Sequence, residues 1–181
     1  MAATKALSDT DQKFILHWGE MGARWGINRT VAQVHALLFI SPKPLNAEYI
    51  QETLGVARSN VSTSLRELQG WGIVRLVHLP GDRRDHYEST KDVWDMFRTV
   101  LDERKKREVD PTLAVIRECL AEANAGKSGG GYTAARLKEL EQFFTVTTSW
   151  YTTVRNWPTP LLVKFLNLGE KLKKLAGLGA D

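Results

Sequence analysis

The chain has little cysteine, no long apolar run and no strong excess of either charge. A single cysteine, Cys119, stands among its 181 residues, so the chain cannot form an internal disulfide. No stretch approaches the roughly twenty apolar residues that cross a bilayer, and Met1–Asp11 has no apolar run of the kind found in export signals. We therefore expect a cytoplasmic protein without membrane contact, in which Cys119 is a small buried side chain.

The sequence also lacks the residue patterns of a metal site or an enzyme. Its four histidines are not spaced like metal ligands, and no cysteine or acidic cluster completes a set around them. No nucleophile–base pair or pair of carboxylates stands out. Gly126-Lys127-Ser128 lacks the glycine that a phosphate-binding loop has five positions earlier, where Ala121 stands. We therefore expect no metal, no cofactor and no enzymatic activity.

The charge balance permits a nucleic-acid partner but does not predict one. With 43% hydrophobic and 25% charged residues, the chain has the composition of a folded globular protein. Its net charge is +4 and its isoelectric point about 9.2, well short of a basic nucleic-acid-binding tail. Between Val56 and Glu88, five arginines accompany four acidic residues. The function therefore depends on where the fold places these arginines.

Helical periodicity and capping residues predict four helices in the first seventy residues. Ser8 and Asp11 have the spacing of a capping box, Asn28 and Asn46 can each cap a following helix, and Gly55 suits a helix end. The four helices cover about residues 9–24, a segment from Asn28 to Ser41, a short segment from Asn46 to Gly55, and about 57–70.

A β-hairpin is expected directly after the fourth helix. Gly72–Leu79 is rich in β-forming residues, Pro80–Arg84 has turn composition, and Asp85–Ser89 is a second, shorter strand. Three helices followed by a hairpin have the order of a winged helix-turn-helix, which spans about 28–90. The expected fold class is thus mainly α with a small β-hairpin, with additional N- and C-terminal helices.

The helix expected over 57–70 has the two faces of a DNA recognition helix. Val61, Leu65 and Leu68 share the side that would face the core. The opposite side carries short donors and acceptors flanked by arginine, which suit a major groove about 12 Å wide. These residues are Arg58, Ser59, Asn60, Ser62, Thr63 and Arg66. We predict that Arg58 reads guanine and Asn60 reads adenine in double-stranded DNA.

The turn of the hairpin supplies a second group of DNA-binding candidates. Arg83 and Arg84 are placed to enter the adjacent minor groove or to contact its phosphates, with Asp82 orienting one of them. Residues 82–85 can also be a mutually neutralising surface turn.

A winged helix can also serve as a protein-interaction module that never reads bases. In that alternative the polar face of the fourth helix is only solvated, and Glu–Lys pairs would be typical of it. The short hydroxyl and amide side chains between Arg58 and Arg66 instead favour a sequence-specific DNA-binding transcriptional regulator.

Three segments of the chain resemble the multiple-antibiotic-resistance regulator (MarR) superfamily, and more closely its GbsR-like branch, which includes repressors of glycine-betaine synthesis. The segments are Gly26–Leu38, Leu54–Ser62 and the wing Gly81–His86. The resemblance is densest over about 24–125. It implies ligand-controlled repression by a homodimer, and an Asp-x-Arg wing motif on Asp82 and Arg84 with Arg84 in the minor groove. The leucine–threonine pair that closes the wing in the wider superfamily is not evident at Glu88–Ser89, so ligand pockets built beside that pair do not carry over.

Apolar stripes outside the winged helix independently indicate a homodimer, because a small winged domain cannot cover them. Their residues are Val93, Phe97, Val100 or Leu101 in one segment, and Leu161, Leu162, Phe165, Leu168 or Gly169, Leu172 and Leu175 in another. Two-fold symmetry would place two recognition helices roughly 34 Å apart on a pseudo-palindromic operator.

The expected organisation has five segments. They are an N-terminal dimerisation helix in 1–27, the winged domain 28–90, a linking helix in 91–125, a flexible linker 126–131, and C-terminal helices in 132–181 for dimerisation and effector binding. Thr90 can cap the linking helix. Asp110-Pro111 breaks or restarts it.

Six tryptophans are many for a chain of this length. Some of them could form a cage for a small-molecule effector, a quaternary ammonium compound, through cation–π attraction. The candidate contacts are Trp94, Trp150 and Tyr151, with Trp18, Trp25 and Trp157 as further members. Packing in the core and in a dimer interface is the other interpretation, and the more frequent one for aromatic residues. Trp71 is expected in the core in either case.

Overall fold

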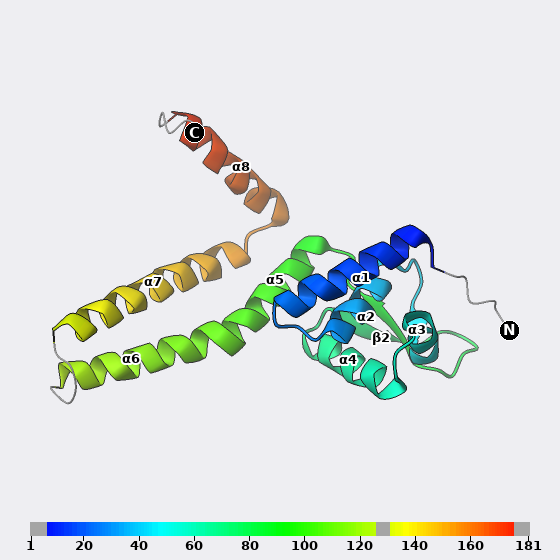
Figure 1. The fold of residues 1–181 in the computed structure, drawn as a ribbon. Coiled ribbons are helices and arrows are strands. Elements are labelled where there is room, and N and C mark those ends of the chain that lie inside the picture. The colour runs from blue at the N-terminus through cyan, green and yellow to red at the C-terminus, as the bar shows by residue number, and fades with distance from the viewer. Residues whose placement is uncertain (1–6, 126–130, 176–181) are drawn as a thin grey trace. The chain divides into compact units, whose positions relative to one another are not determined.

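The chain folds into two compact units in the computed structural model, Met1–Val100 (unit 1) and Leu101–Asp181 (unit 2). The structure describes residues 7–125 and 131–175, and side chains as far as Leu168. Residues 126–130 of the predicted flexible linker lie outside the described part. Figure 1 shows the fold of each unit. The division of the chain into five functional segments stays a prediction.

Unit 1 is a helical domain with a small sheet, as its sequence predicts. Its elements are α1 (Asp9–Arg24), α2 (Arg29–Ile40), β1 (Leu45–Asn46), α3 (Ala47–Leu54), α4 (Arg58–Gly70), β2 (Val74–Val77), β3 (His86–Ser89) and the start of α5 (Val93–Arg104). The mainly α fold with a β-hairpin is confirmed.

The predicted caps define the helix starts. The Ser8 hydroxyl accepts a hydrogen bond from Asp11 N at 3.1 Å, and the Asp11 carboxylate accepts one from Ser8 N at 3.2 Å. The Asn28 amide oxygen accepts from Thr30 N, and that of Asn46 from Tyr49 N, both at 2.8 Å. Each side chain satisfies a backbone N–H that has no partner within the helix.

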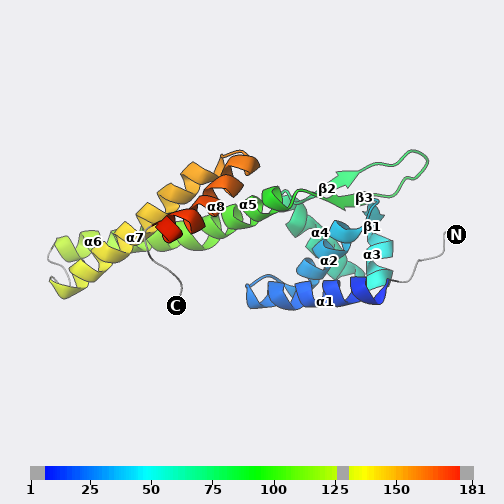
Figure 2. The ribbon, with the colours of Figure 1, turned by 90° about the horizontal axis from the view of Figure 1, so that it is seen from above.

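The sheet has one strand more than the hairpin that the sequence predicts. β2 and β3 pair antiparallel with Val74 opposite Ser89, and β1 pairs with the other edge of β3, Leu45 opposite Tyr87. β1 was not predicted from the sequence, because a strand of two residues is too short to show the alternation of apolar and polar side chains that identifies a strand. Figure 2 shows the loop between β2 and β3 extending beyond the helices of unit 1.

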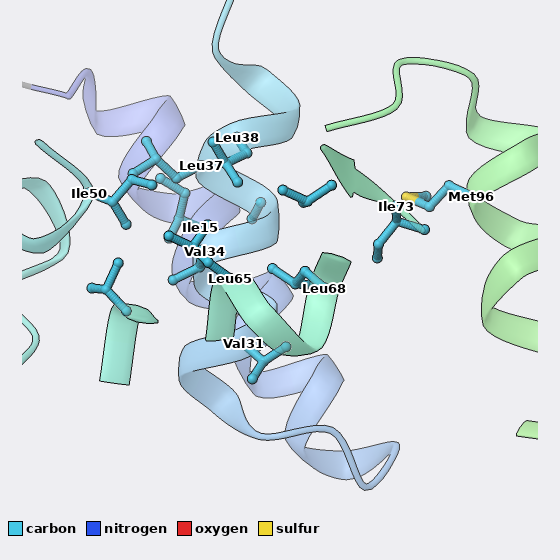
Figure 3. Close-up of a cluster of buried hydrophobic side chains, with 13 residues drawn as sticks. Ile15, Val31, Val34, Leu37, Leu38, Ile50, Leu65, Leu68, Ile73 and Met96 are labelled. Atoms are coloured by element: carbon cyan, nitrogen blue, oxygen red, sulfur yellow. The ribbon is translucent and has the colours of Figure 1, made fainter. Parts of the chain in front are cut away.

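The core of unit 1 is one cluster of aliphatic side chains (Figure 3). α2 supplies Val31, Val34, Leu37 and Leu38, and α4 supplies Val61, Leu65 and Leu68. Ile15, Ile50, Ile73 and Met96 close the cluster from α1, α3, the start of the hairpin and α5. Trp71 is half-buried against this cluster, in line with the expectation that it belongs to the core.

Helix α5 begins later than the sequence predicts, and a different residue caps it. The Oδ1 atom of Asp92 accepts hydrogen bonds from Trp94 N at 2.8 Å and Asp95 N at 3.0 Å. Thr90 was predicted to cap this helix. That prediction is wrong, because Thr90 N donates to Ile73 O at 2.9 Å and so extends the sheet pairing.

Unit 2 consists of helices. After the end of α5 come a π-helical turn, η1 (Lys105–Val109), then α6 (Asp110–Asn124), α7 (Tyr132–Arg155) and α8 (Thr159–Leu175). The π turn lies directly before Pro111, which has no N–H and whose ring crowds the preceding turn. This is the restart that Asp110-Pro111 predicts.

α6 and α7 pack side by side within unit 2. The buried side of α6 carries Leu113, Ile116 and Ala123. Cys119 follows Ile116 by three residues and precedes Ala123 by four, so it lies near the same side of α6, but it is exposed. The prediction that Cys119 is buried is therefore wrong, because the side chains that pack against α6 leave this position uncovered.

Two glycines of α1 mark its close approach to α2. A Cβ atom at Gly22 would lie 2.6 Å from the Cβ atom of Ala32, a group fixed to the α2 backbone. A Cβ atom at Gly19 would lie 2.6 Å from Cγ of Gln33, part of a flexible side chain. The two positions therefore differ in how easily the neighbour can move.

We predict that Gly22→Ala lowers the free energy of unfolding by about 1–3 kcal/mol, since the helices must separate. Gly19→Ala should change it by less than about 1 kcal/mol, because Gln33 can adopt another rotamer and alanine favours the helix. Urea unfolding of both variants measures the difference. Equal destabilisation by the two substitutions would contradict the assignment of Gly22 as the tighter contact.

Candidate nucleic-acid interface

Helix α4 presents a buried side and a polar side. Val61, Leu65 and Leu68 are almost fully buried, and Ser64 lies between them. All six polar residues predicted for DNA contact are exposed: Arg58, Ser59, Asn60, Ser62, Thr63 and Arg66. Packing of the apolar side of α4 therefore keeps the hydrogen-bond donors and acceptors of its polar side exposed.

The first turn of α4 is open toward solvent. Its N-cap, Ala57, has an extended backbone and a methyl side chain that cannot accept a hydrogen bond. The N–H groups of the first turn consequently remain available for an anion, as at phosphate-binding helix starts. Arg58, Ser59 and Asn60 are the first three residues of this helix.

Gly55 shapes the turn between α3 and α4. It adopts a left-handed conformation with φ of 62° at the end of α3, a region that glycine enters without steric cost. Asn46 caps the start of α3, so both ends of this helix are defined by local chemistry. The result is a helix-turn-helix in which α4 is the second helix.

The tip of the hairpin is organised by Asp82 and Arg84. The Asp82 carboxylate accepts hydrogen bonds from Arg84 Nε at 2.9 Å and from Arg84 Nη2 at 2.5 Å, and Asp82 Oδ1 also accepts from Arg84 N at 3.0 Å. These bonds hold the pKa of Asp82 far below its usual range and raise that of Arg84. Charge-assisted, two-pronged contacts of this kind fix the guanidinium plane.

Two further residues hold this tip on the domain. The buried ring of His86 lies with Nδ1 2.9 Å from Arg84 O and Nε2 3.5 Å from the Asp82 carboxylate. Arg84 Nη1 lies 3.7 Å from Glu48 on α3. Arg83, next to Arg84, is exposed. The structure thus brings Asp82 and Arg84 together and leaves Arg83 pointing to solvent.

A hydrogen-bond network at the base of the hairpin was not predicted from the sequence. Lys91 Nζ donates hydrogen bonds to the carbonyl oxygens of Leu38, Phe39 and Ser41 at 2.8–2.9 Å, so it satisfies the end of α2. Beside it, a hydrogen bond of 3.2 Å joins His35 Nε2 to the Ser89 hydroxyl on β3. Because these contacts join residues about fifty positions apart, no short segment of the sequence predicts them.

Unit 1 also contains an apolar cavity of about 380 Å³. Side chains of α1, α2 and α5 and the end of α4 line it, among them Trp18, Trp25, Trp71 and Trp94. No aspartate, glutamate, lysine or arginine occurs in the described part of its wall, and His35 is a polar member. Three of the predicted cage residues, Trp18, Trp25 and Trp94, therefore share one cavity.

The other aromatic candidates lie in unit 2. Trp150 is exposed on α7, and Tyr151 is half-buried. The Tyr151 hydroxyl donates to Asp102 at 2.8 Å, and Arg155 Nε donates to the same carboxylate at 2.7 Å. Burial and this carboxylate raise the pKa of Tyr151 to about 12. Trp157 contacts Phe165 with ring centroids 5.3 Å apart.

The described residues contain neither a group of metal-ligating side chains nor a helix that could span a membrane. Over residues 7–125 and 131–175 no three His, Cys, Asp or Glu side chains gather in a way that could hold a metal ion. No helix in the same part of the chain has both the length and the apolar character of a membrane span.

Comparison with known proteins shows a similarity that covers the winged region. The model of the MarR family matches residues 25–85, the segment that contains α2 to α4 and most of the hairpin. This segment, about a third of the chain, is similar to the MarR family. The match covers the polar side of α4 and the Asp82–Arg84 tip, and it stops short of unit 2.

Two relatives share parts of the chain. YvaV of Bacillus subtilis (strain 168), named as an HTH-type transcriptional regulator, is 26% identical over 95 residues, which are 52% of this chain and 54% of YvaV. The chain thus spans about half the length of this curated relative. A crystal structure described as that of a transcriptional regulator matches 81% of this chain and 95% of its own, with a TM-score of 0.55 and 16% identity. At that identity the likeness shows the winged-helix fold alone.

The buried His35 generates a prediction about pH. Burial, and then the charge of Lys91, lower its pKa from 6.5 to about 4. A depressed pKa means that His35 stabilises the fold fully above pH 6.5, and that this stabilisation is lost as the pH falls toward 4. Between pH 7 and pH 5 the loss should be about 2 kcal/mol.

Urea unfolding at these two pH values measures the loss. His35→Gln should reduce the difference between the two pH values by that amount, whereas His17→Gln, at an exposed position of α1, should leave it unchanged. An unaltered pH dependence in His35→Gln would show that His35 is not held neutral by the fold.

Proposed function

We propose that the chain is a sequence-specific DNA-binding transcriptional regulator that acts as a homodimeric repressor. The observation that carries the proposal is the exposed polar side of α4 behind a glycine-ended turn, within a segment that matches the MarR family. Arg58 and Asn60 read bases in the major groove, while the hydroxyls and first-turn N–H groups bind phosphates. The names of the two matched regulators support the same class.

The wing supplies the second contact of each subunit. Arg84, oriented by Asp82, enters the minor groove, and Arg83 binds the neighbouring phosphates. An arginine whose guanidinium plane is already fixed loses less side-chain entropy when it binds. The family resemblance to the GbsR-like branch adds the repressor role and the pseudo-palindromic operator.

The DNA-binding proposal predicts distinct effects of base-reading and phosphate-binding residues. Operators are first selected from bound genomic fragments, and affinities are then measured over a range of salt concentrations. Arg58→Ala and Asn60→Ala should each weaken operator binding about 5- to 150-fold and reduce discrimination between operator and random DNA. Arg83→Ala should weaken both kinds of DNA alike and reduce the salt slope by about one.

Lys13→Ala is the matched control, because Lys13 is an exposed cation on α1, outside the proposed interface. Its affinity and salt slope should equal those of the unaltered protein. Unchanged operator affinity in both Arg58→Ala and Asn60→Ala would contradict the assignment of base readers. A chain that selects no genomic fragment would overturn the function itself.

The proposed effector is a quaternary ammonium compound, bound in the tryptophan-lined cavity of unit 1. Four indole rings on an apolar wall offer the faces that attract such a cation. Trp94 is the central candidate, since it lies on α5 at the cavity wall. Trp150 and Tyr151 lie in unit 2 and are not among the residues that line this cavity, so their role as effector contacts stays a prediction from the sequence.

Titration with choline and with its neutral isostere 3,3-dimethylbutan-1-ol tests the cage. Because cation–π attraction needs the charge, choline should bind about 5- to 30-fold more tightly than the isostere, and Trp94→Leu should remove that preference. Isothermal calorimetry measures the affinity for each compound, and operator binding measures whether each compound changes the affinity for DNA. Equal affinity for both compounds would contradict the cage, and an unaltered choline affinity in Trp150→Leu would exclude Trp150.

A further inference from the structure

The apolar cavity of unit 1 has one strong hydrogen-bond acceptor among the described side chains of its wall. Apart from Gly22 and Ala32, these are large aliphatic side chains, methionines, a phenylalanine, tryptophans and His35. An indole N–H donates a hydrogen bond but cannot accept one, and a thioether accepts only weakly. The bonding state of His35 therefore decides which polar group a bound molecule can present to this wall.

One nitrogen of His35 is already engaged, and its partner determines the tautomer of the ring. His35 Nε2 lies 3.2 Å from the Ser89 hydroxyl oxygen, and the same hydroxyl donates to Thr90 O at 3.1 Å. A serine hydroxyl has a single proton, and the bond to Thr90 O uses it. Ser89 Oγ can then only accept from the ring. These partners assign the ring proton of His35 to Nε2.

The other nitrogen, Nδ1, is consequently an acceptor. Burial, and then the charge of Lys91, lower the pKa of His35 to about 4, so the ring is neutral at pH 7. Nδ1 has no hydrogen-bond partner among the described residues, but protein atoms do not enclose it. Because His35 is only 5% exposed and lines the cavity, the cavity is the open space beside Nδ1. A buried acceptor in this position favours a bound molecule that supplies a donor.

Aromatic neighbours hold the His35 ring in place. Its centroid lies 6.3 Å from that of Trp18 and 6.1 Å from that of Phe39. Nε2 is bonded to Ser89 on β3, so the direction of Nδ1 is set before any molecule enters the cavity. A contact with a side chain that is already ordered costs little conformational entropy.

We propose that His35 Nδ1 accepts a hydrogen bond from an O–H or N–H group of the molecule that occupies this cavity, so that the site selects alcohols over carboxylates. The inference rests on the proposed function only in placing the effector in this cavity. A carboxylate has no proton to donate at neutral pH, and no lysine or arginine of the described wall would pair with its charge. The ligand class is a compact apolar or quaternary ammonium compound with one hydroxyl or N–H donor.

Exchange of a hydroxyl group for fluorine tests the hydrogen bond directly. (2-Fluoroethyl)trimethylammonium has the charge and nearly the size of choline but no donor. Choline should bind the full chain about 5- to 30-fold more tightly than this analogue, because the analogue leaves Nδ1 without a partner. Isothermal calorimetry measures both affinities. Equal affinities would overturn the proposal.

A second pair of probes makes the test independent of cation–π attraction. 3,3-Dimethylbutan-1-ol and 3,3-dimethylbutanoate share an uncharged apolar body and differ in the polar group. The alcohol should bind at least about 30-fold more tightly, since the carboxylate would be buried without a partner. The fluorescence of the tryptophans in the wall reports binding. A carboxylate that binds as tightly as the alcohol contradicts the proposal, and so does the absence of binding by all four compounds.

Substitution of His35 links the preference to this side chain. His35→Leu keeps an apolar side chain in the core but removes Nδ1, so this variant should bind choline and its fluorinated analogue alike. His17→Leu is the matched control, because His17 is exposed on α1 and does not line the cavity. The control should keep the wild-type preference, and circular dichroism confirms that both variants keep their helices. A His35→Leu chain with the wild-type preference would show that another group binds the hydroxyl.

Long-range ¹H–¹⁵N NMR of the wild-type chain measures the tautomer without any substitution. At pH 7, His35 should show a protonated Nε2 and an unprotonated Nδ1. Choline should shift the Nδ1 resonance, whereas the fluorinated analogue should shift it less. A proton on Nδ1 in the free protein would overturn the proposal, because Nδ1 would then be a donor.

Operator binding separates this inference from the proposed function. If choline releases the operator but binds no more tightly than its fluorinated analogue, the role of His35 is wrong and the ligand-responsive regulator stands. If choline is preferred over the analogue but leaves operator affinity unchanged, the His35 contact stands and the effector role of the cavity is wrong.

Discussion

Burial of the inner side of α4 against α2 is the constraint on which the proposed interface depends. Val61, Leu65 and Leu68 enter the same cluster as Val34 and its neighbours on α2. Each step along a helix turns the side chain by about 100°. A helix rotated by one residue would expose Leu65 and bury a charged side chain, which is costly. The core therefore determines which side of α4 is exposed and available for the proposed contact with DNA.

The parts of the fold set by neighbouring residues were predictable from the sequence. Ser8, Asn28 and Asn46 each bond a backbone N–H two or three positions ahead, and Gly55 ends α3 with the left-handed conformation that glycine allows. Such chemistry acts within one turn of helix, so a short window of sequence contains all of it. The exposed side of α4 followed from the same kind of evidence, the spacing of its apolar residues.

The parts that depend on distant residues were not predictable. Lys91 satisfies the end of α2 through three carbonyl groups some fifty residues earlier, and β1 exists only because β3 offers an unpaired edge. Thr90 has the side chain of a helix cap, but its backbone continues the sheet pairing with Ile73 and α5 begins three residues later at Val93, so the Asp92 carboxylate caps the helix. In each case, tertiary contacts select one of several local conformations that the neighbouring residues allow equally well.

The two units differ in how they are stabilised, and this difference bears on their roles. Unit 1 buries a continuous cluster from five helices and the hairpin, so the exposed side of α4 can carry polar groups without loss of the fold. Unit 2 buries few side chains and displays its apolar surface. Joining two weakly binding winged domains raises the local concentration of the second domain once the first is bound, so affinity for a two-part operator grows without new base contacts. In the proposed homodimer, α4 would recognise each half-site, and the pairing of the two copies would determine that both half-sites are recognised together.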